Sequence, residues 1–331
     1  MRTISYTRPS DVPGAIAAVT ADPGSAYLAG GTTEIDLLRL DVLRPRHLVD
    51  VGRLPLTAIE DLDDGGMRIG AMCRMSDVAE SPAVARKFPM LSQALLQGAS
   101  PQLRHMASMG GNLMQRVRCS YYRDTESACN KRVPGSGCAA LDGVNRGHAV
   151  LGTSEQCIAT HPSDLAVALV ALDAMVHVEG ETGPRVIPAD DFFLLPGDTP
   201  EREHPLAPGE LITAIGLPAV PMARGSLYLK VRDRASYEFA LASVAVALAL
   251  QDGVIQEVRL ALGGVATKPW RARRAEAVLT GQPPGADLFD RAAVEELEPA
   301  QPRPMNAFKV QLARRTMVRA LHTAAEAGGF A

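Results

Sequence analysis

The chain has 331 residues, more than one compact core usually holds, so its length predicts two or three packed units. Hydrophobic residues make up 47% of the sequence, charged residues 21% and aromatic residues 4%, a globular composition that excludes a low-complexity or collagen-like chain. The net charge is −3 and Lys and Arg are dispersed, so nothing predicts nucleic-acid binding.

Targeting signals are not apparent in the sequence. The stretch from Met1 to Pro13 contains no apolar run of signal-peptide length. The most apolar stretch, Phe239 to Leu250, is too short to span a bilayer and leads into the turn signal Gln251-Asp252-Gly253. We therefore expect a cytoplasmically made chain without a membrane span, which would need a signal-bearing partner to reach another compartment.

Apolar periodicity predicts helices and strands in alternation along the chain. Helices are expected at Val12 to Val19, Glu34 to Leu43, Ser76 onward (with Ser76 as N-cap), Met90 to Gly98, Asp164 to Leu172, Arg271 to Thr280, Leu288 to Leu297 and Met305 to Ala327. Strands are expected at Ser25 to Ala29, His47 to Asp50, Met67 to Ala71, Ala174 to Val178, Leu211 to Leu217, Ser226 to Val231, Ala242 to Leu250 and Val254 to Leu262.

Two Gly-Gly turns are candidate phosphate-binding sites. The turn at Gly30-Gly31 follows a predicted buried strand and precedes a helix, and a second turn at Gly110-Gly111 is followed by Asn112. Glycines let the backbone approach an anion closely, and exposed N–H groups before a helix can bind phosphate oxygens. A plain strand-to-helix turn is the alternative. The G-x-G-x-x-A match at Gly135 to Ala140 follows no strand and does not indicate a dinucleotide site.

Residues 113–160 have no sustained apolar period, and a loop this long is normally functional or held in place. Four of the five cysteines lie in it, at Cys119, Cys129, Cys138 and Cys157, whereas Cys73 stands apart and is expected to be a buried structural residue. An iron–sulfur cluster, a structural zinc, two disulfides and coincidence all remain open. The zinc alternative lacks the usual close C-x₂₋₄-C pairs, because the gaps are 9, 8 and 18 residues. Basic residues that could stabilise an anionic cluster surround the cysteines: Arg116, Arg118, Arg123, Lys131, Arg132 and Arg146.

Three motifs together resemble the FAD-binding medium subunits of the xanthine dehydrogenase family: Ala29-Gly30-Gly31-Thr32, Met109-Gly110-Gly111-Asn112 and Thr160 to Ala166. The resemblance implies an α+β fold, with a two-part FAD-binding domain of the vanillyl-alcohol-oxidase/xanthine dehydrogenase type. It also implies a carboxy-terminal α+β domain like that of carbon monoxide dehydrogenase flavoproteins, with a three-stranded antiparallel sheet and helices. The expected boundaries are 1–55 and 56–222 for the two FAD-binding subdomains and 223–331 for the carboxy-terminal domain.

The same resemblance assigns roles to individual residues. It implies that backbone amides in the two turns hold the FAD pyrophosphate, that Asp164 binds the ribityl or adenosine part, and that Leu211 and Lys230 line the flavin end. The expected FAD-contacting residues are Ala29, Gly30, Gly31, Thr32, Thr33, Glu34, Ser108, Gly110, Gly111, Asn112, Met114, Asp164, Leu211 and Lys230.

The cysteine-rich insert, residues 114–159, is similar to one in the flavin subunits of bacterial periplasmic aldehyde oxidoreductases and, more loosely, of hydroxybenzoyl-CoA reductase. There it binds a [4Fe–4S] cluster, so the resemblance implies that Cys119, Cys129, Cys138 and Cys157 are the ligands. The implied function is electron transfer in a heterotrimer with a large molybdopterin-binding subunit and a small [2Fe–2S] subunit. Co-export with a signal-bearing partner would place the complex in the periplasm; a cytoplasmic location is the alternative.

Two other functions fit the residues. One is a self-sufficient flavoprotein oxidoreductase whose cysteines form a structural clamp, and the other is a zinc-containing binding module without enzymatic activity. No constellation for hydrolysis or acid–base catalysis is apparent, because the seven histidines are dispersed and lack paired carboxylates or Cys partners nearby in the sequence.

Overall fold

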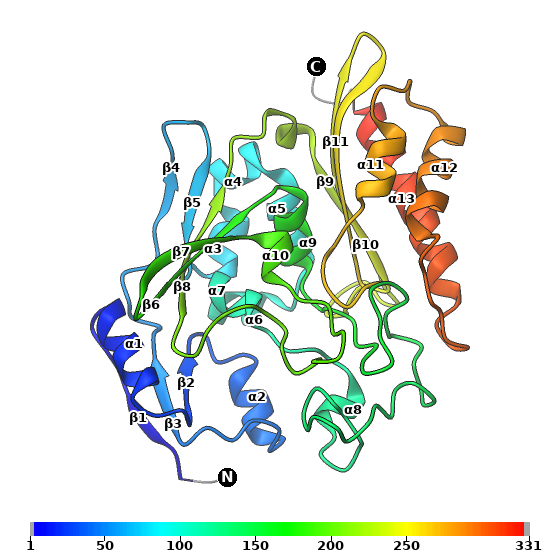
Figure 1. The fold of residues 1–331 in the computed structure, drawn as a ribbon. Coiled ribbons are helices and arrows are strands. Elements are labelled where there is room, and N and C mark those ends of the chain that lie inside the picture. The colour runs from blue at the N-terminus through cyan, green and yellow to red at the C-terminus, as the bar shows by residue number, and fades with distance from the viewer. Residues whose placement is uncertain (1–2, 328–331) are drawn as a thin grey trace.

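The computed structural model describes residues 3–327, so the ends of the expected terminal domains, residues 1–2 and 328–331, lie outside the described residues. The architecture is α+β with three sheets (Figure 1). The first sheet is parallel and has the order β1-β3-β2. Its elements are β1 (Ser5–Thr7), α1 (Val12–Thr20), β2 (Ser25–Leu28), α2 (Glu34–Arg39) and β3 (His47–Asp50). The alternation of helices and strands predicted at this end of the chain is confirmed.

The second sheet is antiparallel, with the order β4-β5-β8-β6-β7. Its strands are β4 (Ile59–Asp61), β5 (Met67–Gly70), β6 (Met175–Gly180), β7 (Gly183–Pro188) and β8 (Leu211–Leu217). The accompanying helices are α3 (Met75–Glu80), α4 (Pro82–Lys87), α5 (Pro89–Gln97), α6 (Pro101–Met106), α7 (Met109–Leu113), α9 (Asp164–Ala171) and α10 (Ala189–Phe192).

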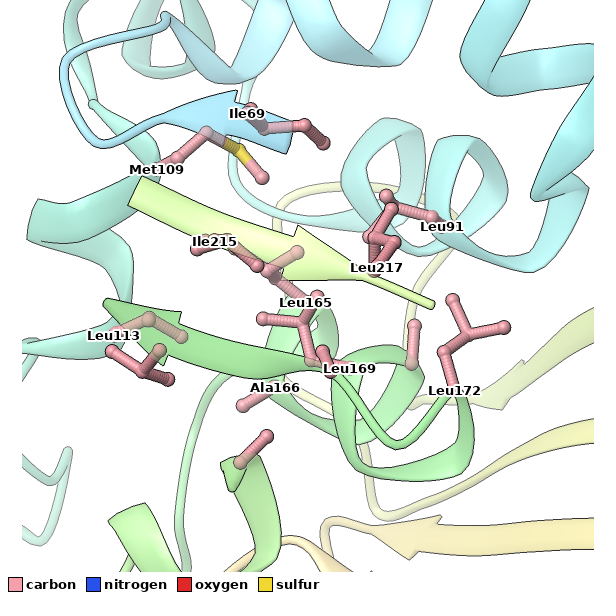
Figure 2. Packing of buried hydrophobic residues seen from close by; sticks show 14 of the residues in the cluster. Ile69, Leu91, Met109, Leu113, Leu165, Ala166, Leu169, Leu172, Ile215 and Leu217 are labelled. Carbon is pink, nitrogen blue, oxygen red and sulfur yellow. The ribbon is translucent and has the colours of Figure 1, made fainter. Parts of the chain in front are cut away.

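The core of this middle region forms where α7 and α9 meet the second sheet. Figure 2 shows Leu165 and Leu169 of α9 directed toward Ile215 of β8, with Met109 of α7 nearby. Every residue of α9 is buried, which follows from its uninterrupted apolar sequence after Asp164. Both α7 and α9 carry predicted site residues at their N-terminal ends, so this packing fixes the position of part of the site.

The carboxy-terminal sheet has four strands in the order β12-β11-β10-β9, not the predicted three. The strands are β9 (Leu227–Val231), β10 (Ala242–Gln251), β11 (Val254–Gly263) and β12 (Trp270–Arg271), and the short helix η1 (Pro221–Gly225) precedes them. The fourth strand was missed because β12 has only two residues and shows no alternation of its own. The three helices α11 (Arg273–Leu279), α12 (Ala286–Leu297) and α13 (Phe308–Glu326) lie on one side of this sheet (Figure 1).

Strand β10 is buried on both faces and divides the two main cores. Its larger side chains, such as Val244 and Val246, pack with the carboxy-terminal helices. Its alanines Ala245 and Ala247 face the core that contains α9. Small side chains on that face let α9 pack close to the sheet, so the carboxy-terminal region is joined to the middle region through a continuous apolar contact.

The predicted elements differ from the structure mainly at their ends. Helix α2 ends at Arg39 instead of Leu43, because Asp41 adopts a left-handed conformation with φ +57° that stops the helix. Arg74, not Ser76, is the N-cap of α3, so Ser76 lies inside the helix. None of the helices within residues 3–327 has the length and apolar character that crossing a membrane requires.

The cysteine-rich insert contains one short helix, α8 (Ser120–Arg123), and otherwise consists of turns, isolated β-bridges and irregular segments. Polar side chains hold it in place. Arg132 Nη1 donates to the carbonyl oxygens of Tyr121 and Tyr122 at 2.7 and 2.8 Å, and Lys131 Nζ donates to Pro200 O at 2.7 Å. The expectation that this loop is pinned is therefore confirmed.

Candidate cofactor site

The first sheet, the middle region and the carboxy-terminal sheet together enclose a pocket of about 710 Å³. This volume is within the range of small-molecule and cofactor sites. All fourteen residues predicted to contact FAD line the pocket, although they come from five separate stretches of the chain. The structure therefore brings every one of these residues to a single cavity.

The first Gly-Gly turn presents backbone amides that have no partner in the protein. Among the described residues, no backbone or side-chain acceptor takes a hydrogen bond from the amides of Gly30 to Thr33. Gly31 has φ +72°, a conformation that favours glycine. A Cβ on Gly30 would lie 2.0 Å from the carbonyl oxygen of Met106, so only glycine fits there. These free amides, next to the start of α2, suit an anionic group such as a pyrophosphate.

The second Gly-Gly turn is built differently, and the predicted role of its amides needs correction. The amide of Gly110 donates to Ala71 O at 2.8 Å, that of Gly111 to Ser108 Oγ at 3.1 Å, and that of Asn112 to Ser108 O at 2.9 Å. These groups already have protein partners because the turn is the first turn of α7. Gly110 instead allows close packing, since its Cβ would be 3.0 Å from that of Ala71. Of the two Gly-Gly turns, only the first therefore presents free backbone donors to the pocket among the described residues.

Asp164 and Lys230 form a buried ion pair in the pocket wall, with Lys230 Nζ 2.7 Å from Asp164 Oδ2. Tyr228 also donates its hydroxyl to Asp164 Oδ1 at 2.5 Å, and Lys230 donates to the carbonyl of Gln97 at 3.0 Å. Burial raises the pKa of Asp164, while Lys230 and Tyr228 act to lower it. Leu211 of β8 is buried and lines the same pocket. The two predicted residues are thus direct partners of each other.

Glu34 is the one predicted residue with an unpaired buried carboxylate oxygen. Its Oε1 has no hydrogen-bond partner among the described residues. Burial raises the pKa of Glu34 to about 7, and the positive charge of Arg116 opposes that rise. Arg116 itself forms an ion pair with Glu203. Near neutral pH, this part of the pocket can therefore hold either a neutral or an ionised carboxyl group.

Other residues of the pocket were not predicted. Tyr27, Arg118, His204, Tyr237 and Phe239 all line it, and the last two come from the loop between β9 and β10. Tyr237 adopts φ +52°, uncommon for a bulky residue and typical of strained functional loops. Alternation of side chains along the extended segment before Cys119 was the one available signal for Arg118. The positions of the other four residues in the pocket wall depend on tertiary contacts, which the sequence pattern does not indicate.

The four clustered cysteines line a second, small pocket next to the first one, whereas Cys73 is buried elsewhere. Cys129 and Cys138 form an isolated β-bridge, and His148 Nε2 lies 3.2 Å from Cys119 Sγ. All four thiols are free, so the structure contains none of the disulfides that were an alternative. Across the described chain, no three or more His, Cys, Asp or Glu side chains are arranged to hold a metal ion.

Burial dominates the protonation of two of these thiols, those of Cys119 and Cys157. Burial raises the pKa of Cys119 to about 12, although hydrogen bonds from the backbone amides of Tyr122 and Tyr121 act to lower it. It raises the pKa of Cys157 to about 11, although the positive charge of Lys131 acts to lower it. In the protein without a bound metal, both groups are therefore protonated. Metal ligands must be thiolates, so ligation here would release protons.

Comparison with known proteins places these features in a family. Residues 2–220 match the FAD binding domain in molybdopterin dehydrogenase, and residues 227–324 match the CO dehydrogenase flavoprotein C-terminal domain. The aldehyde oxidoreductase FAD-binding subunit PaoB of Escherichia coli is 49% identical over 97% of this chain and 98% of its own length. The nicotine 6-hydroxylase medium subunit of Paenarthrobacter nicotinovorans is 30% identical over 89% of this chain and 87% of its own.

A solved structure of carbon monoxide dehydrogenase from Hydrogenophaga pseudoflava contains a chain with the same fold, with a TM-score of 0.77 and 26% identity over 98% of both chains. The carboxy-terminal α+β domain and the FAD-binding region predicted from sequence are thus both present. On the strength of the matching family models and the 49% identical relative, the chain belongs to the FAD-binding medium subunits of the molybdenum hydroxylase family.

Proposed function

We propose that the chain is the FAD-carrying electron-transfer subunit of a heterotrimeric molybdenum aldehyde oxidoreductase. The observation that carries this proposal is the 49% identity, over nearly the whole of both chains, to an aldehyde oxidoreductase FAD-binding subunit. In such a complex the chain accepts electrons from a large molybdopterin-binding subunit through a small [2Fe–2S] subunit and passes them to an external acceptor. FAD supplies the two-electron redox chemistry, and the protein binds and positions it.

The fourteen pocket residues are proposed to hold FAD in the following way. The free amides of Gly30 to Thr33 suit the pyrophosphate, because they are donors without protein acceptors next to a helix start. Asp164 and Lys230 lie together in another part of the wall and supply polar contacts for the ribityl or flavin portion. The domain ranges 1–55, 56–222 and 223–331 remain the proposed division of the chain.

A test of this function compares the chain alone with the chain co-expressed with its genomic neighbours. Aldehyde oxidation is assayed with an artificial electron acceptor, and flavin is measured by absorbance. The proposal expects flavin in both samples and turnover only in the complex. Turnover by the isolated chain would instead support a self-sufficient flavoenzyme, and an isolated chain without flavin would contradict the assignment of the pocket.

The proposal also includes a [4Fe–4S] cluster held by Cys119, Cys129, Cys138 and Cys157. Two observations support it: the four cysteines line one pocket, and none forms a disulfide. The resemblance of the insert to those of related flavin subunits implies the same cluster. A cluster is larger than a single ion, so its ligands surround a volume instead of meeting at one point. The positive charge of Lys131 lowers the pKa of the Cys157 thiol, so Lys131 would help stabilise the anionic cluster and its thiolate ligands.

Metal analysis of anaerobically purified protein tests the cluster. Iron and acid-labile sulfide should each approach about four per chain, and replacement of any one of the four cysteines by Ser should lower both. Cys73→Ser is the matched control, because Cys73 is buried outside the cysteine pocket and should leave both values unchanged. Zinc in place of iron would contradict the proposal.

The resemblance of the insert to those of periplasmic aldehyde oxidoreductases supports a periplasmic location, reached by co-export with a partner that bears a twin-arginine signal. Cell fractionation tests this expectation. The chain should appear in the periplasmic fraction when the complete complex is expressed, and it should remain in the cytoplasm when the signal is deleted from the large partner. Periplasmic protein after that deletion would rule out co-export.

A further inference from the structure

The cofactor pocket and the cysteine pocket share one stretch of chain as a common wall. Residues 116–119 run without helical structure from the end of α7 to Cys119. Arg116 and Arg118 line the cofactor pocket, whereas Val117 and Cys119 line the cysteine pocket. Side chains of an extended chain alternate between opposite sides, so consecutive residues here reach two different sites.

Arg118 contacts both loops that close the cofactor pocket at this wall. Its Nη2 lies 3.3 Å from Thr33 Oγ1, at the end of the turn with the free amides. Its guanidinium carbon lies 5.4 Å from the ring centroid of Phe239, in the loop between β9 and β10. The side chain is 27% exposed, and its Nε has no hydrogen-bond partner among the described residues. A single guanidinium thus connects the cysteine insert, the phosphate-binding turn and the carboxy-terminal domain.

The positive charge of Arg118 is only partly balanced by protein groups. Its nearest carboxylate is that of Asp36, whose Oδ2 lies 3.6 Å from Arg118 Nη1. The same oxygen forms a closer ion pair with Arg123. Arg123 does not line the cofactor pocket. Because Asp36 is shared between two cations, the Arg118 guanidinium keeps donor capacity for an anionic ligand, and a planar guanidinium matches phosphate oxygens well.

We propose that Arg118 is a cofactor-positioning residue whose guanidinium contacts the FAD pyrophosphate at the Gly30–Thr33 turn and couples FAD binding to the integrity of the cysteine pocket. The proposal rests on the proposed function for both groups. Displacement of Cys119 would move the adjacent Arg118 out of reach of Thr33, because only one peptide bond separates the two residues. The insert would thereby contribute to FAD affinity through this residue.

Substitution of Arg118 in the full chain tests the FAD contact. Flavin is removed, and the dissociation constant for FAD is measured by fluorescence titration. Arg118→Gln should raise that constant about ten- to a hundredfold, the effect expected for a charge-assisted hydrogen bond. Arg118→Lys, which keeps the charge, should recover part of the affinity. The matched control is Arg123→Gln, which removes the other partner of Asp36 and should change the constant less than about threefold.

The proposal is overturned if Arg118→Gln binds FAD like the parent, if Arg123→Gln weakens binding equally, or if Arg118→Lys recovers no affinity. A double-mutant cycle with Cys119→Ser then tests the coupling. Cys119→Ser should weaken FAD binding in the Arg118 parent and have no further effect in the Arg118→Gln background. Equal weakening in both backgrounds would overturn the coupling. If the parent protein contains no iron, only the cluster assignment is wrong, because the effect of Arg118 on FAD binding is measured separately.

Discussion

Lys230 of the carboxy-terminal sheet and Asp164 at the start of α9 form an ion pair of 2.7 Å across the junction of the two domains. Both side chains are almost completely buried, with 1% and 8% of their surface exposed. The pair therefore joins the FAD-binding region to the carboxy-terminal domain at the cofactor pocket. Removal of either partner would destabilise the protein, because the remaining charge would be buried without an opposite charge beside it.

Lys230→Met should lower the free energy of unfolding by about 3–5 kcal/mol, because it leaves the Asp164 carboxylate buried without its cation. Urea denaturation of the purified chain measures the change. Arg274→Met provides the control: Arg274 pairs with Glu298 on the surface, where both side chains are at least half exposed. Its loss should cost less than about 1 kcal/mol. Similar costs for the two substitutions would show that the buried pair does not stabilise the junction.

Gly30→Ala should release FAD. The new Cβ would be 2.0 Å from the backbone carbonyl oxygen of Met106, so the turn must move. Gly111→Ala should be milder, because the nearest atom to its Cβ is the Ser108 hydroxyl at 2.8 Å, a side-chain group that can rotate. The ratio of flavin to protein absorbance after purification measures both effects. Gly285→Ala, with open space around its Cβ, should retain full flavin, and the reverse order of Gly30 and Gly111 would contradict this account.

Local sequence features explain how much of this site could be predicted. The first Gly-Gly turn was found because a strand, a turn and a helix start follow one another directly in the sequence, whereas Asp164 was assigned through the resemblance to the family. The role of Arg118 depends on contacts with Thr33 and Phe239, which are far away in the chain. The amides of the second turn appeared free in the sequence, but they are occupied because Ala71 and Ser108 accept from them in the folded protein.

The same distinction holds for the fold. The hairpin of β10 and β11 was predicted closely, because long alternating strands flank an Asp-Gly turn. The two-residue strand β12 was missed, since only its pairing with Ala261 and Leu262 defines it. The course of the cysteine insert could not be predicted either. Single side chains such as Arg132 hold its turns, and no periodic pattern encodes such contacts.

Glu34 should make FAD binding depend on pH. Burial raises its pKa to about 7, so the carboxyl is mostly neutral below that pH and ionised above it. An ionised Glu34 beside the phosphate-binding turn repels the anionic cofactor. Affinity should therefore be full below pH 7 and fall as the pH rises through 7, by at most about tenfold per pH unit for one coupled proton. Titrations between about pH 6 and 8.5 should show this slope in the parent and a flat profile in Glu34→Gln. A slope that persists in the variant would assign the effect to another group.

Lys309 of α13 should anchor the end of the cysteine insert to the carboxy-terminal domain. Its fully buried ammonium group donates to the carbonyl oxygens of Gly147, His148 and Gly264 at 3.1, 3.0 and 2.5 Å. Burial lowers the pKa of Lys309 to about 7, with a smaller effect from Arg146. The three carbonyl oxygens favour the charged form, so we expect the ammonium to persist at neutral pH.

Lys309→Met should leave the Gly264 carbonyl oxygen without a donor, whereas Gly147 O still accepts from Thr160 Oγ1 and His148 O from Asn306 Nδ2. The free energy of unfolding should fall by about 1–3 kcal/mol. It should also lower the iron content, because His148 connects this anchor to Cys119 through the 3.2 Å contact between Nε2 and Sγ. Urea denaturation and iron analysis measure the two effects. Arg314→Met on the same helix removes only a partly exposed pair with Asp290 and should change neither by much. Full iron content in Lys309→Met, together with lowered stability, would show that the anchor supports the domain but not the cysteine pocket.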